Sequence, residues 1–324
     1  MKEGGALQLP AVGPGPALRI VREPGELLRE TRPVCAALGF FDGVHLGHQA
    51  VLAQAMADAR EQGGLPVVVT FDVHPSAVLA PDHAAPLLYP LEKRLETLEE
   101  CGMGAALLLH FDAALSRVGA REFVQRLAAS FGRLSSVSVG VNFGFGHRRS
   151  GNLDLLRDMC GELGFKVHGV APVDQEGQAI SSTRVRELVL RGRFELAGKL
   201  LGRPYHLAGR VIGGDRRGRQ LGFPTANLDV AGLAIPPNGV YATRAWAGGE
   251  RHPSVTNIGR RPTVATPGSP VTVETHLLDF AGDLYGQPVE LEFLAKLRDE
   301  IKFSSLQELQ TRIEADTAAA RGCF

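Results

Sequence analysis

A change of sequence pattern near Pro204 most constrains how this chain can fold. From Val34 to about Val173, apolar runs of strand length alternate with amphipathic stretches whose apolar residues recur at helical spacing. This alternation predicts a doubly wound parallel sheet with helices on both faces. Beyond Pro204, short alternating segments are separated by turn residues, which is typical of an antiparallel sheet or barrel. We therefore expect an α/β unit followed by an antiparallel β-barrel.

The length of the chain fits two such domains. It has 324 residues, and domains usually run about 100–200 residues. We place the boundary in the helical stretch 187–203 and predict domains of residues 17–187 and 188–324. The Gly- and Pro-rich start is expected to form a loose N-terminal arm.

One helix is expected to close the chain. Ser305 and Glu308 have the spacing of a capping box, in which each residue bonds the backbone of the other. Leu306, Leu309 and Ile313 follow at helical spacing and predict its apolar stripe.

Composition excludes several classes of protein. Lys+Arg and Asp+Glu both number 35, so the net charge of +0 gives no basic excess for nucleic acid. The longest apolar stretches are far shorter than the ~18–20 residues of a membrane span, and the start lacks an apolar signal core. The four cysteines are not closely spaced, so neither a zinc site nor a disulfide framework is expected. We predict a cytoplasmic protein with reduced thiols and with neither nucleic-acid nor membrane partners.

The stretch GFFDGVHLGHQAVL follows the first predicted strand and begins a predicted helix. Ligands of open parallel sheets bind at the carboxyl ends of the strands, and a helix N-terminus attracts phosphate. His45 and His48 are three residues apart, so both imidazoles would face the same side of such a phosphate site. Gly47 between them lets a ligand come close.

Imidazole can donate hydrogen bonds to phosphate oxygens and can carry charge near neutral pH. Catalysis would then rest on positioning and charge stabilisation rather than on a covalent nucleophile. A metal pair is a second interpretation, but zinc would want a third ligand and no obvious motif nearby supplies one. A third is a capped helix with two partly buried histidines, which the flanking Gly39, Asp42 and Gly43 disfavour.

Two further segments of the first half are candidates for the same site. Asn142 follows the apolar run SVSVGV and is expected at the same edge of the sheet. The segment ISST precedes a predicted helix, so Ser181, Ser182 and Thr183 can cap it and build a second phosphate-binding N-terminus. Arg186, one turn further, could add a fixed positive charge. Plain helix capping remains the alternative for any one of these hydroxyls.

The second half contains GGDRRGRQLGFPTANL, in which Gly and Arg interleave before a strand. Such a loop can wrap phosphates, although an exposed hairpin loop has the same pattern. Thr225 and Asn227 are two apart on a strand and so point to one face, where their oxygens suit Mg²⁺. Glu274 alternates with apolar neighbours and is expected to face away from them; a surface glutamate is the alternative.

These motifs resemble a known family. GFFDGVHLGH resembles the His-x-Gly-His signature of nucleotidyltransferases, and with TFDVHP, VNFGFGHRRSGN and ISSTRVR it resembles the first half of the bifunctional prokaryotic riboflavin kinase/FAD synthetases. GDRRGRQLGFPTAN resembles the central flavokinase motif, and NGVYATR, TNIGRRPT, VETHLLDF and LRDEIKFSSLQEL follow in the family's order. Two departures are Val73, where proline is more usual, and Val264, where an aromatic residue is more usual.

The resemblance implies two successive reactions. The barrel would phosphorylate riboflavin with ATP to FMN, and the first domain would join FMN to AMP from a second ATP, giving FAD and pyrophosphate. It implies that Glu274 is the general base, that Thr225 and Asn227 hold Mg²⁺, and that His45, His48 and Asn142 act at the adenylyl-transfer centre. A chain that retains one activity, and a flavin sensor without turnover, are the alternatives.

The resemblance also implies the binding residues. It assigns nucleotide binding to Gly39, Phe40, Asp42, Gly43, Gly47, Ser181, Ser182, Thr183 and Arg186 in the first half, and to Gly213, Asp215, Gly218, Gly222 and Pro224 in the second. It assigns flavin binding to Asp72, His74 and Arg298.

Overall fold

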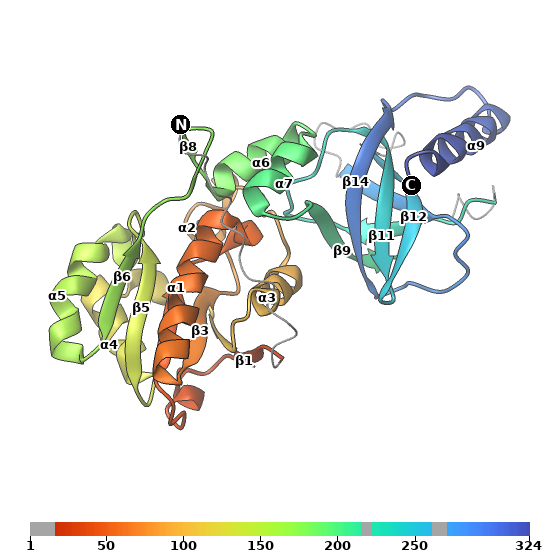
Figure 1. The fold of residues 1–324 in the computed structure, drawn as a ribbon. Helices are drawn as coiled ribbons and strands as arrows, with labels where there is room; N and C mark the ends of the chain where they lie inside the picture. The colour runs from red at the N-terminus through yellow and green to blue at the C-terminus, as the bar shows by residue number, and fades with distance from the viewer. Residues whose placement is uncertain (1–16, 215–221, 261–270) are drawn as a thin grey trace, which may run out of the picture. The chain divides into compact units, whose positions relative to one another are not determined.

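The computed structural model describes residues 17–214, 222–260 and 271–324 and divides the chain into two compact units (Figure 1). The first unit runs to Ala85 and continues over Leu91–Ser181; the second unit comprises Pro86–Pro90 and Ser182–Phe324. The predicted N-terminal arm, Asp215, Gly218 and Val264 lie outside the described residues.

The first unit is built on a six-stranded sheet in the order β1-β4-β3-β2-β5-β6, and every pairing in it is parallel. This confirms the predicted doubly wound sheet. Its strands are β1 (Arg19–Val21), β2 (Val34–Leu38), β3 (Leu65–Phe71), β4 (Ala105–Leu109), β5 (Leu134–Gly140) and β6 (Lys166–Val170). A two-stranded ribbon of β7 (Asp174–Gln175) and β8 (Gln178–Ala179) follows.

Helices cover both faces of this sheet because alternate strand residues point to opposite sides. Ala37 and Val68 pack in one apolar cluster with residues of α1 (Leu46–Gln62) and α3 (Leu91–Glu100). The neighbouring residues Ala36 and Val67 pack in the other cluster, with α4 (Ala120–Ala129) and α5 (Leu153–Leu163). The strands are therefore buried on both faces, which explains their near-continuous apolar runs.

Strand order fixes where a ligand can bind. The chain moves from β2 to β3 and β4 on one side of β2, and then returns to β5 and β6 on the other side. The order of the strands thus reverses between β2 and β5, and the crevice at their carboxyl ends is the usual ligand site of such a sheet.

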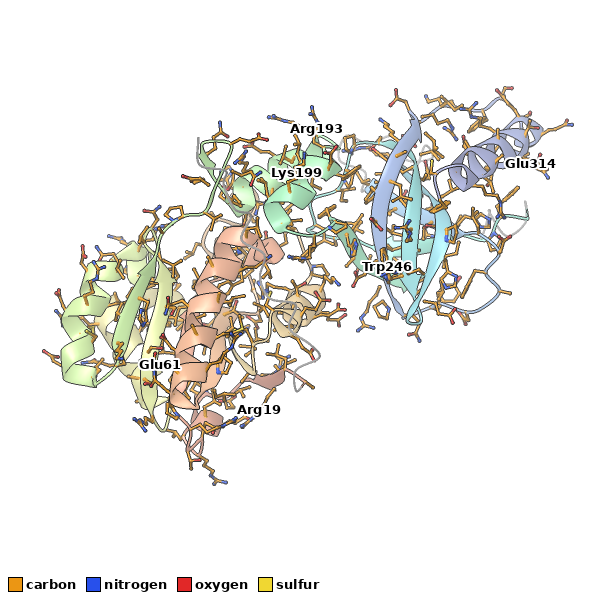
Figure 2. The ribbon with its side chains drawn as sticks, in the orientation of Figure 1. Arg19, Glu61, Arg193, Lys199, Trp246 and Glu314 are labelled. Atoms are coloured by element: carbon orange, nitrogen blue, oxygen red, sulfur yellow. The ribbon has the colours of Figure 1, made fainter. Side chains whose placement is uncertain are left out.

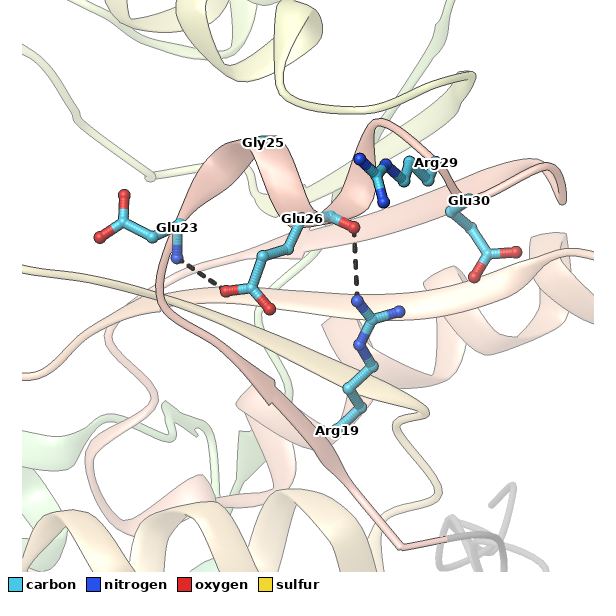
Figure 3. A pocket seen from close by; sticks show the side chains of 6 residues that line it. All are labelled: Arg19, Glu23, Gly25, Glu26, Arg29 and Glu30. Carbon is cyan, nitrogen blue, oxygen red and sulfur yellow. Dashed lines mark hydrogen bonds between the residues drawn. The ribbon is translucent and has the colours of Figure 1, made fainter.

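A charged cavity of about 510 Å³ lies at the opposite edge of the sheet (Figure 3). Arg19 at the start of β1 donates a hydrogen bond to the Glu26 carbonyl oxygen at 3.3 Å, and Glu30 precedes β2. The lining residues are Arg19, Glu23, Gly25, Glu26, Arg29 and Glu30. Because this cavity is at the amino ends of the strands, it is separate from the predicted site.

The second unit contains a closed barrel in the order β10-β13-β12-β11-β14-β9, with antiparallel pairings throughout. This confirms the predicted barrel. Its strands are β9 (His206–Ile212), β10 (Ala226–Asp229), β11 (Gly239–Ala247), β12 (Glu250–Arg260), β13 (Val271–Leu277) and β14 (Pro288–Arg298). Gly248 and Gly249 join β11 to β12 with φ values of 61° and 84°, which a two-residue hairpin turn requires.

A chain of hydroxyl groups is buried among these strands. Thr243 Oγ1 lies 2.8 Å from Ser254 Oγ and 2.7 Å from Thr256 Oγ1, which in turn donates to Thr275 Oγ1 at 3.0 Å. All four side chains are 0% exposed. Each buried hydroxyl therefore finds its partner on a neighbouring strand, as burial of polar groups demands.

Helices α6 (Ser182–Leu190) and α7 (Phe194–Leu201) precede the barrel, and α9 (Leu306–Arg321) closes the chain as predicted. The Ser305 side chain accepts a hydrogen bond from the Glu308 N–H at 3.1 Å. The reciprocal bond differs from the prediction, because the Glu308 carboxylate accepts from Ser304. The stripe was also predicted one residue too long. Leu306 is 71% exposed, since only Leu309 and Ile313 reach the cavity wall of the barrel.

Candidate functional site

The two histidines lie where β2 gives way to α1. His45 is the N-cap of α1, and its Nδ1 accepts a hydrogen bond from the His48 backbone N–H at 3.3 Å. The two rings stack with centroids 3.7 Å apart and an angle of 17° between their planes. The helix start therefore places both imidazoles on one side, as their spacing predicted.

The loop between β2 and α1 has an uncommon backbone. Phe41, Gly43 and Val44 have φ values of 60°, 75° and 41°, and such a value is rare for a β-branched residue like valine. The Gln49 side chain holds this turn by donating to the Val44 carbonyl oxygen at 2.8 Å. Backbone strain of this kind persists where the surroundings over-determine it, and it clusters at functional sites.

Gly47 allows close approach on the inner side of the loop. A Cβ added to it would lie 3.2 Å from His45 ring atoms and 3.7 Å from the Ile180 carbonyl oxygen. The structure thus brings the start of the ISST segment beside the histidine loop. Ser181 directly precedes α6, which begins with Ser182 and Thr183. Arg186 Nε donates to the Pro86 carbonyl oxygen at 2.5 Å.

The predicted nucleotide residues before α1 are packed tightly. A Cβ on Gly39 would lie 3.0 Å from the Phe41 ring, and Thr70 donates to the Phe40 carbonyl oxygen at 3.0 Å. Asp42 is 3% exposed. The Phe40 ring meets the His74 ring edge-on, with centroids 4.5 Å apart. This contact joins the loops after β2 and β3.

His74 and Asp72, predicted to bind flavin, form parts of the second loop. His74 is the N-cap of α2 (Pro75–Leu79) and accepts from the Ser76 N–H at 3.1 Å. Asp72 accepts from the backbone N–H groups of Val73 at 2.7 Å and Phe111 at 3.1 Å. Its second oxygen lies 2.7 Å from His110 Nδ1. The carboxylate therefore ties the ends of β3 and β4 together.

This contact shifts both pKa values. The hydrogen bond that His110 donates to the Asp72 carboxylate raises the pKa of His110 above its ordinary 6.5. Burial works against ionisation of Asp72, but the hydrogen bonds from His110, Phe111 and Val73 together lower its pKa. For His110, the contribution to stability is fully present below its unfolded-state pKa and is lost as pH rises through its raised folded-state pKa.

We expect Asp72→Asn to return the pKa of His110 toward 6.5, because the neutral amide no longer favours the imidazolium. A histidine-ring NMR titration of both proteins measures the change. The ring resonances of the exposed His83, which lies outside this contact, should have the same positions in the two proteins. An unshifted His110 in the native protein would contradict the pairing.

Asn142 lies at the same edge of the sheet. It follows β5, which pairs in parallel with β2, and it sits in a turn in which Phe143 N–H donates to the Gly140 carbonyl oxygen at 2.9 Å. The side chain is exposed. The sheet therefore presents Asn142 and the histidine loop at the ends of the two strands that flank the switch point.

The barrel has its own cavity of about 240 Å³, into which several predicted residues are brought together. Glu274, Thr225 and Arg298 all line it. Asn227 is opposite Glu274 in the β10–β13 register, while Asn257 is opposite Glu274 on the other side. The cavity joins a carboxylate, a hydroxyl and a guanidinium, with an amide on the adjoining strand.

Alternation along β13 explains how Glu274 reaches this cavity. Val273, Thr275 and Leu277 are buried at 1%, 0% and 5% exposure, whereas Glu274 and His276 line the cavity. Glu274 thus faces away from its buried neighbours, as expected from the sequence. His276 Nδ1 also lies 2.7 Å from the carbonyl oxygen of Pro224, which directly precedes Thr225.

Gly214 and Gly222 are the described residues on either side of the segment 215–221 of the predicted phosphate loop. Gly222 has a φ of 88°, a conformation that favours glycine. Gly213 follows the end of β9, and a Cβ on the adjacent Gly214 would collide with the Asn227 side chain. Gly214, at one described end of the predicted phosphate loop, therefore lies against β10.

Arg298 forms an ion pair that the sequence did not predict. Its Nε lies 3.0 Å from both carboxylate oxygens of Asp316, and its Nη2 is 2.7 Å from Oδ2. The two side chains are only 12% and 5% exposed. Both line the cavity, and Asp316 lies on α9. The pair therefore fixes Arg298 and anchors the closing helix to the barrel.

We expect Asp316→Asn to destabilise the barrel by about 3 kcal/mol, because it leaves a largely buried guanidinium without its counter-charge. Trp246 on β11 is the only tryptophan of the chain, so its fluorescence during urea unfolding reports on the barrel (Figure 2). Arg321→Gln is the matched control on α9. This substitution removes the ion pair between Arg321 and Asp279, whose side chains are 51% and 73% exposed, respectively. Because exposed ion pairs contribute little to stability, the unfolding midpoint should not move. Equal midpoints for all three proteins would contradict the anchoring role.

Within the described residues, no group of three or more His, Cys, Asp or Glu side chains could hold a metal ion. None of the four cysteines, all of which lie within the described residues, forms a disulfide bond. No described helix is long and apolar enough to cross a membrane.

Two families match successive parts of the chain. The FAD synthetase family matches residues 28–184, which contain the histidine loop, and the riboflavin kinase family matches residues 201–324, which contain the barrel. These matches define a two-domain transferase of the flavin nucleotides.

Relatives match the chain over nearly its whole length. The bifunctional riboflavin kinase/FMN adenylyltransferase of Pseudomonas fluorescens is 41% identical over 94% of this chain and 97% of its own. The Escherichia coli (strain K12) protein with the same name is 37% identical over 95% and 98%. The chain therefore belongs to the family of bifunctional riboflavin kinase/FMN adenylyltransferases.

A solved structure has a similar fold. The crystal structure described as a macrolide-efflux protein from Streptococcus pneumoniae is 29% identical, with a TM-score of 0.78. The match covers 94% of this chain and 99% of that one.

Proposed function

We propose that this protein makes FMN from riboflavin and ATP in its second domain, and FAD from FMN and a second ATP in its first. The observation that carries the proposal is that each family match contains the candidate residues of its own reaction. Residues 28–184 hold His45 and His48, and residues 201–324 hold Glu274. We retain 17–187 and 188–324 as the two functional domains.

In the barrel, Glu274 is the general base for riboflavin phosphorylation. It takes the proton of the ribityl 5′-hydroxyl as that oxygen attacks the γ-phosphorus of ATP, the bond to the β-phosphate oxygen breaks and ADP leaves. Arg298 lines the same cavity, and we assign it to flavin binding. Asp316 holds Arg298 in place through both of its carboxylate oxygens. The phosphate-binding residues are Gly213, Asp215, Gly218, Gly222 and Pro224.

Mg²⁺ suits this site because Thr225 and Asn227 offer the hard oxygen ligands that it prefers. The register of β10 with β13 supports this choice, since Asn227 is paired with Glu274. When bound, the ion would neutralise charge on the ATP phosphates.

In the first domain, the FMN phosphate attacks the α-phosphorus of ATP. His45 and His48 donate hydrogen bonds to the α-phosphate and to the departing pyrophosphate, so the stacked pair stabilises developing charge. Asn142 acts at the same centre, and Asp72 and His74 bind the flavin. ATP is held by Gly39, Phe40, Asp42, Gly43, Gly47, Ser181, Ser182, Thr183 and Arg186.

The decisive experiment is a time course of the purified protein with riboflavin, ATP and Mg²⁺, with FMN and FAD separated by chromatography. FMN should appear first and FAD should follow. FMN alone would leave a protein with one activity, and the Val73 departure would be the first suspect. If the protein binds flavin but converts none of it, the proposal is wrong and the protein is a flavin sensor.

We also propose that the protein is located in the cytoplasm, a compartment in which thiols stay reduced. Riboflavin, FMN and ATP are the proposed small-molecule partners, with neither nucleic acid nor membrane.

A further inference from the structure

An arginine that no motif singles out is buried beneath the edge of the sheet where the histidine loop lies. Arg94 is on α3, which packs against the 3₁₀ turn η2 (Asp42–Val44). Its side chain is 1% exposed and is among the largest fully buried side chains of the described residues. Taking a guanidinium out of water is costly unless other groups compensate, so this burial needs a reason.

The contacts of Arg94 reach two loops at once. Its Nη2 donates to the carbonyl oxygen of Phe71, the last residue of β3. Its Cζ lies 4.1 Å from the centroid of the Phe40 ring, a cation–π distance. Phe40 belongs to the loop after β2 and is in edge-on contact with His74 from the loop after β3. One side chain therefore supports the start of both loops.

Charge completes the arrangement. Asp42 in the first loop and Asp72 in the second both attract the Arg94 guanidinium. Burial is the larger influence and lowers the pKa of Arg94 to about 10, so the residue stays a cation at neutral pH. Its Nε has no hydrogen-bond partner among the described residues. The cation thus offsets two carboxylates at an edge that is proposed to receive two anionic substrates.

We propose that Arg94 is a positioning residue for FMN adenylylation, which holds the loops after β2 and β3 in register and neutralises Asp42 and Asp72 beneath the substrate phosphates. This inference rests on the proposed adenylyltransferase site. It does not require Arg94 to touch either substrate.

Three variants test the proposal in the full-length protein: Arg94→Met, Arg94→Lys and, as a control, Lys93→Met. Lys93 is the adjacent residue of α3, is 8% exposed and pairs with Glu96 at 3.2 Å. Initial rates at varied FMN and ATP give kcat and KM for adenylylation. Phosphorylation of riboflavin by the same samples serves as the internal reference.

We expect Arg94→Met to lower kcat/KM for FMN adenylylation about 100-fold, the scale of a misplacement of about 1 Å. The KM values of FMN and ATP should both rise, because the positive charge of Arg94 no longer acts on Asp42 and Asp72. The kcat/KM for riboflavin phosphorylation should change less than about two-fold, which means that this reaction is essentially unaffected. Lys93→Met should resemble the native protein in both reactions.

The Arg94→Lys variant shows whether the positive charge of Arg94 is needed, or only the volume that its side chain occupies. Burial lowers the pKa of a lysine strongly, whereas arginine remains protonated. Arg94→Lys should therefore be more active than Arg94→Met at the acidic end of the pH range and lose that activity as pH rises through a range in which the native protein keeps its own. Asp42 and Asp72 face the cation, and His110 beside Asp72 titrates in every variant, so only the difference between profiles is diagnostic.

Native-like adenylylation by Arg94→Met would overturn the inference. So would an Arg94→Lys protein that is folded and as inactive as Arg94→Met at every pH, because the charge would then be irrelevant. If Arg94→Met fails to fold, the pH profile of Arg94→Lys decides. A native protein that makes FMN but no FAD would instead refute the proposed adenylyltransferase function itself.

Discussion

Replacing Glu274 with glutamine is expected to lower FMN formation by about 10²–10⁴-fold, the contribution of a general base. The amide cannot accept the proton of the attacking hydroxyl, while its size and its place on β13 are retained. Because Glu274 lines the barrel cavity, adenylylation of added FMN should continue at the native rate. The measurement is the rate of each reaction with its own substrate, riboflavin or FMN.

Glu292→Gln supplies the matched control. Glu292 lies on the barrel strand β14 and pairs with Arg244 at 2.9 Å, and it is not among the residues that line the Glu274 cavity. It should leave FMN formation nearly unchanged. If Glu274→Gln kept FMN formation within a few-fold of the native rate, the base would have to be another group. Loss of FAD formation from added FMN would show that the two sites are not separate.

The elements that the sequence predicted are those whose pattern is local. Alternation places Glu274 on the face opposite Val273, and helical spacing places His45 beside His48, because both depend on neighbours a few residues away. The order of the sheet was not predicted strand by strand, but its parallel class followed from the alternation of strands and helices.

The features that escaped prediction depend on distant residues. Asp316 pairs with Arg298 across 18 residues, and no pattern around Asp316 shows that its carboxylate will be buried. Arg94 stands among the charged residues of a helix that begins LEKR, and only the fold turns it inward under Phe40. Buried charges break the rule that apolar residues lie inside, so a periodicity argument cannot find them.

Pro86–Pro90 shows a second limit of sequence reasoning. This short stretch is surrounded in the chain by the first unit, yet its contacts place it in the second. Leu87 explains why, because its N–H donates to the Gly232 carbonyl oxygen at 2.8 Å and its carbonyl oxygen accepts from the Ala234 N–H at 2.7 Å. Such backbone pairing depends on no side-chain pattern, so a boundary drawn from composition misses it.

Replacing His48 with alanine is expected to lower FAD formation about 10²–10³-fold, the loss that follows removal of one donor to a developing charge. FMN formation by the barrel should be unaffected. His48 is a cleaner target than His45, because His45 also caps α1 and its loss would cost about 1 kcal/mol of helix stability. The His48 contribution to the cap is its backbone N–H, which alanine retains.

The stacking of the two rings gives this experiment a second readout. Without His48, the His45 ring loses a stacked ring whose centroid is 3.7 Å away, so the NMR chemical shifts of the His45 ring should change even where folding is intact. His83→Ala, an exposed histidine outside the loop, controls for loss of an imidazole. Equal loss of FMN and FAD in His48→Ala would contradict the two-site proposal. Unchanged FAD formation would show that the His48 side chain has no role in the reaction. The backbone N–H groups at the N-terminus of α1 would then bind phosphate alone, and the histidines would serve only the helix cap.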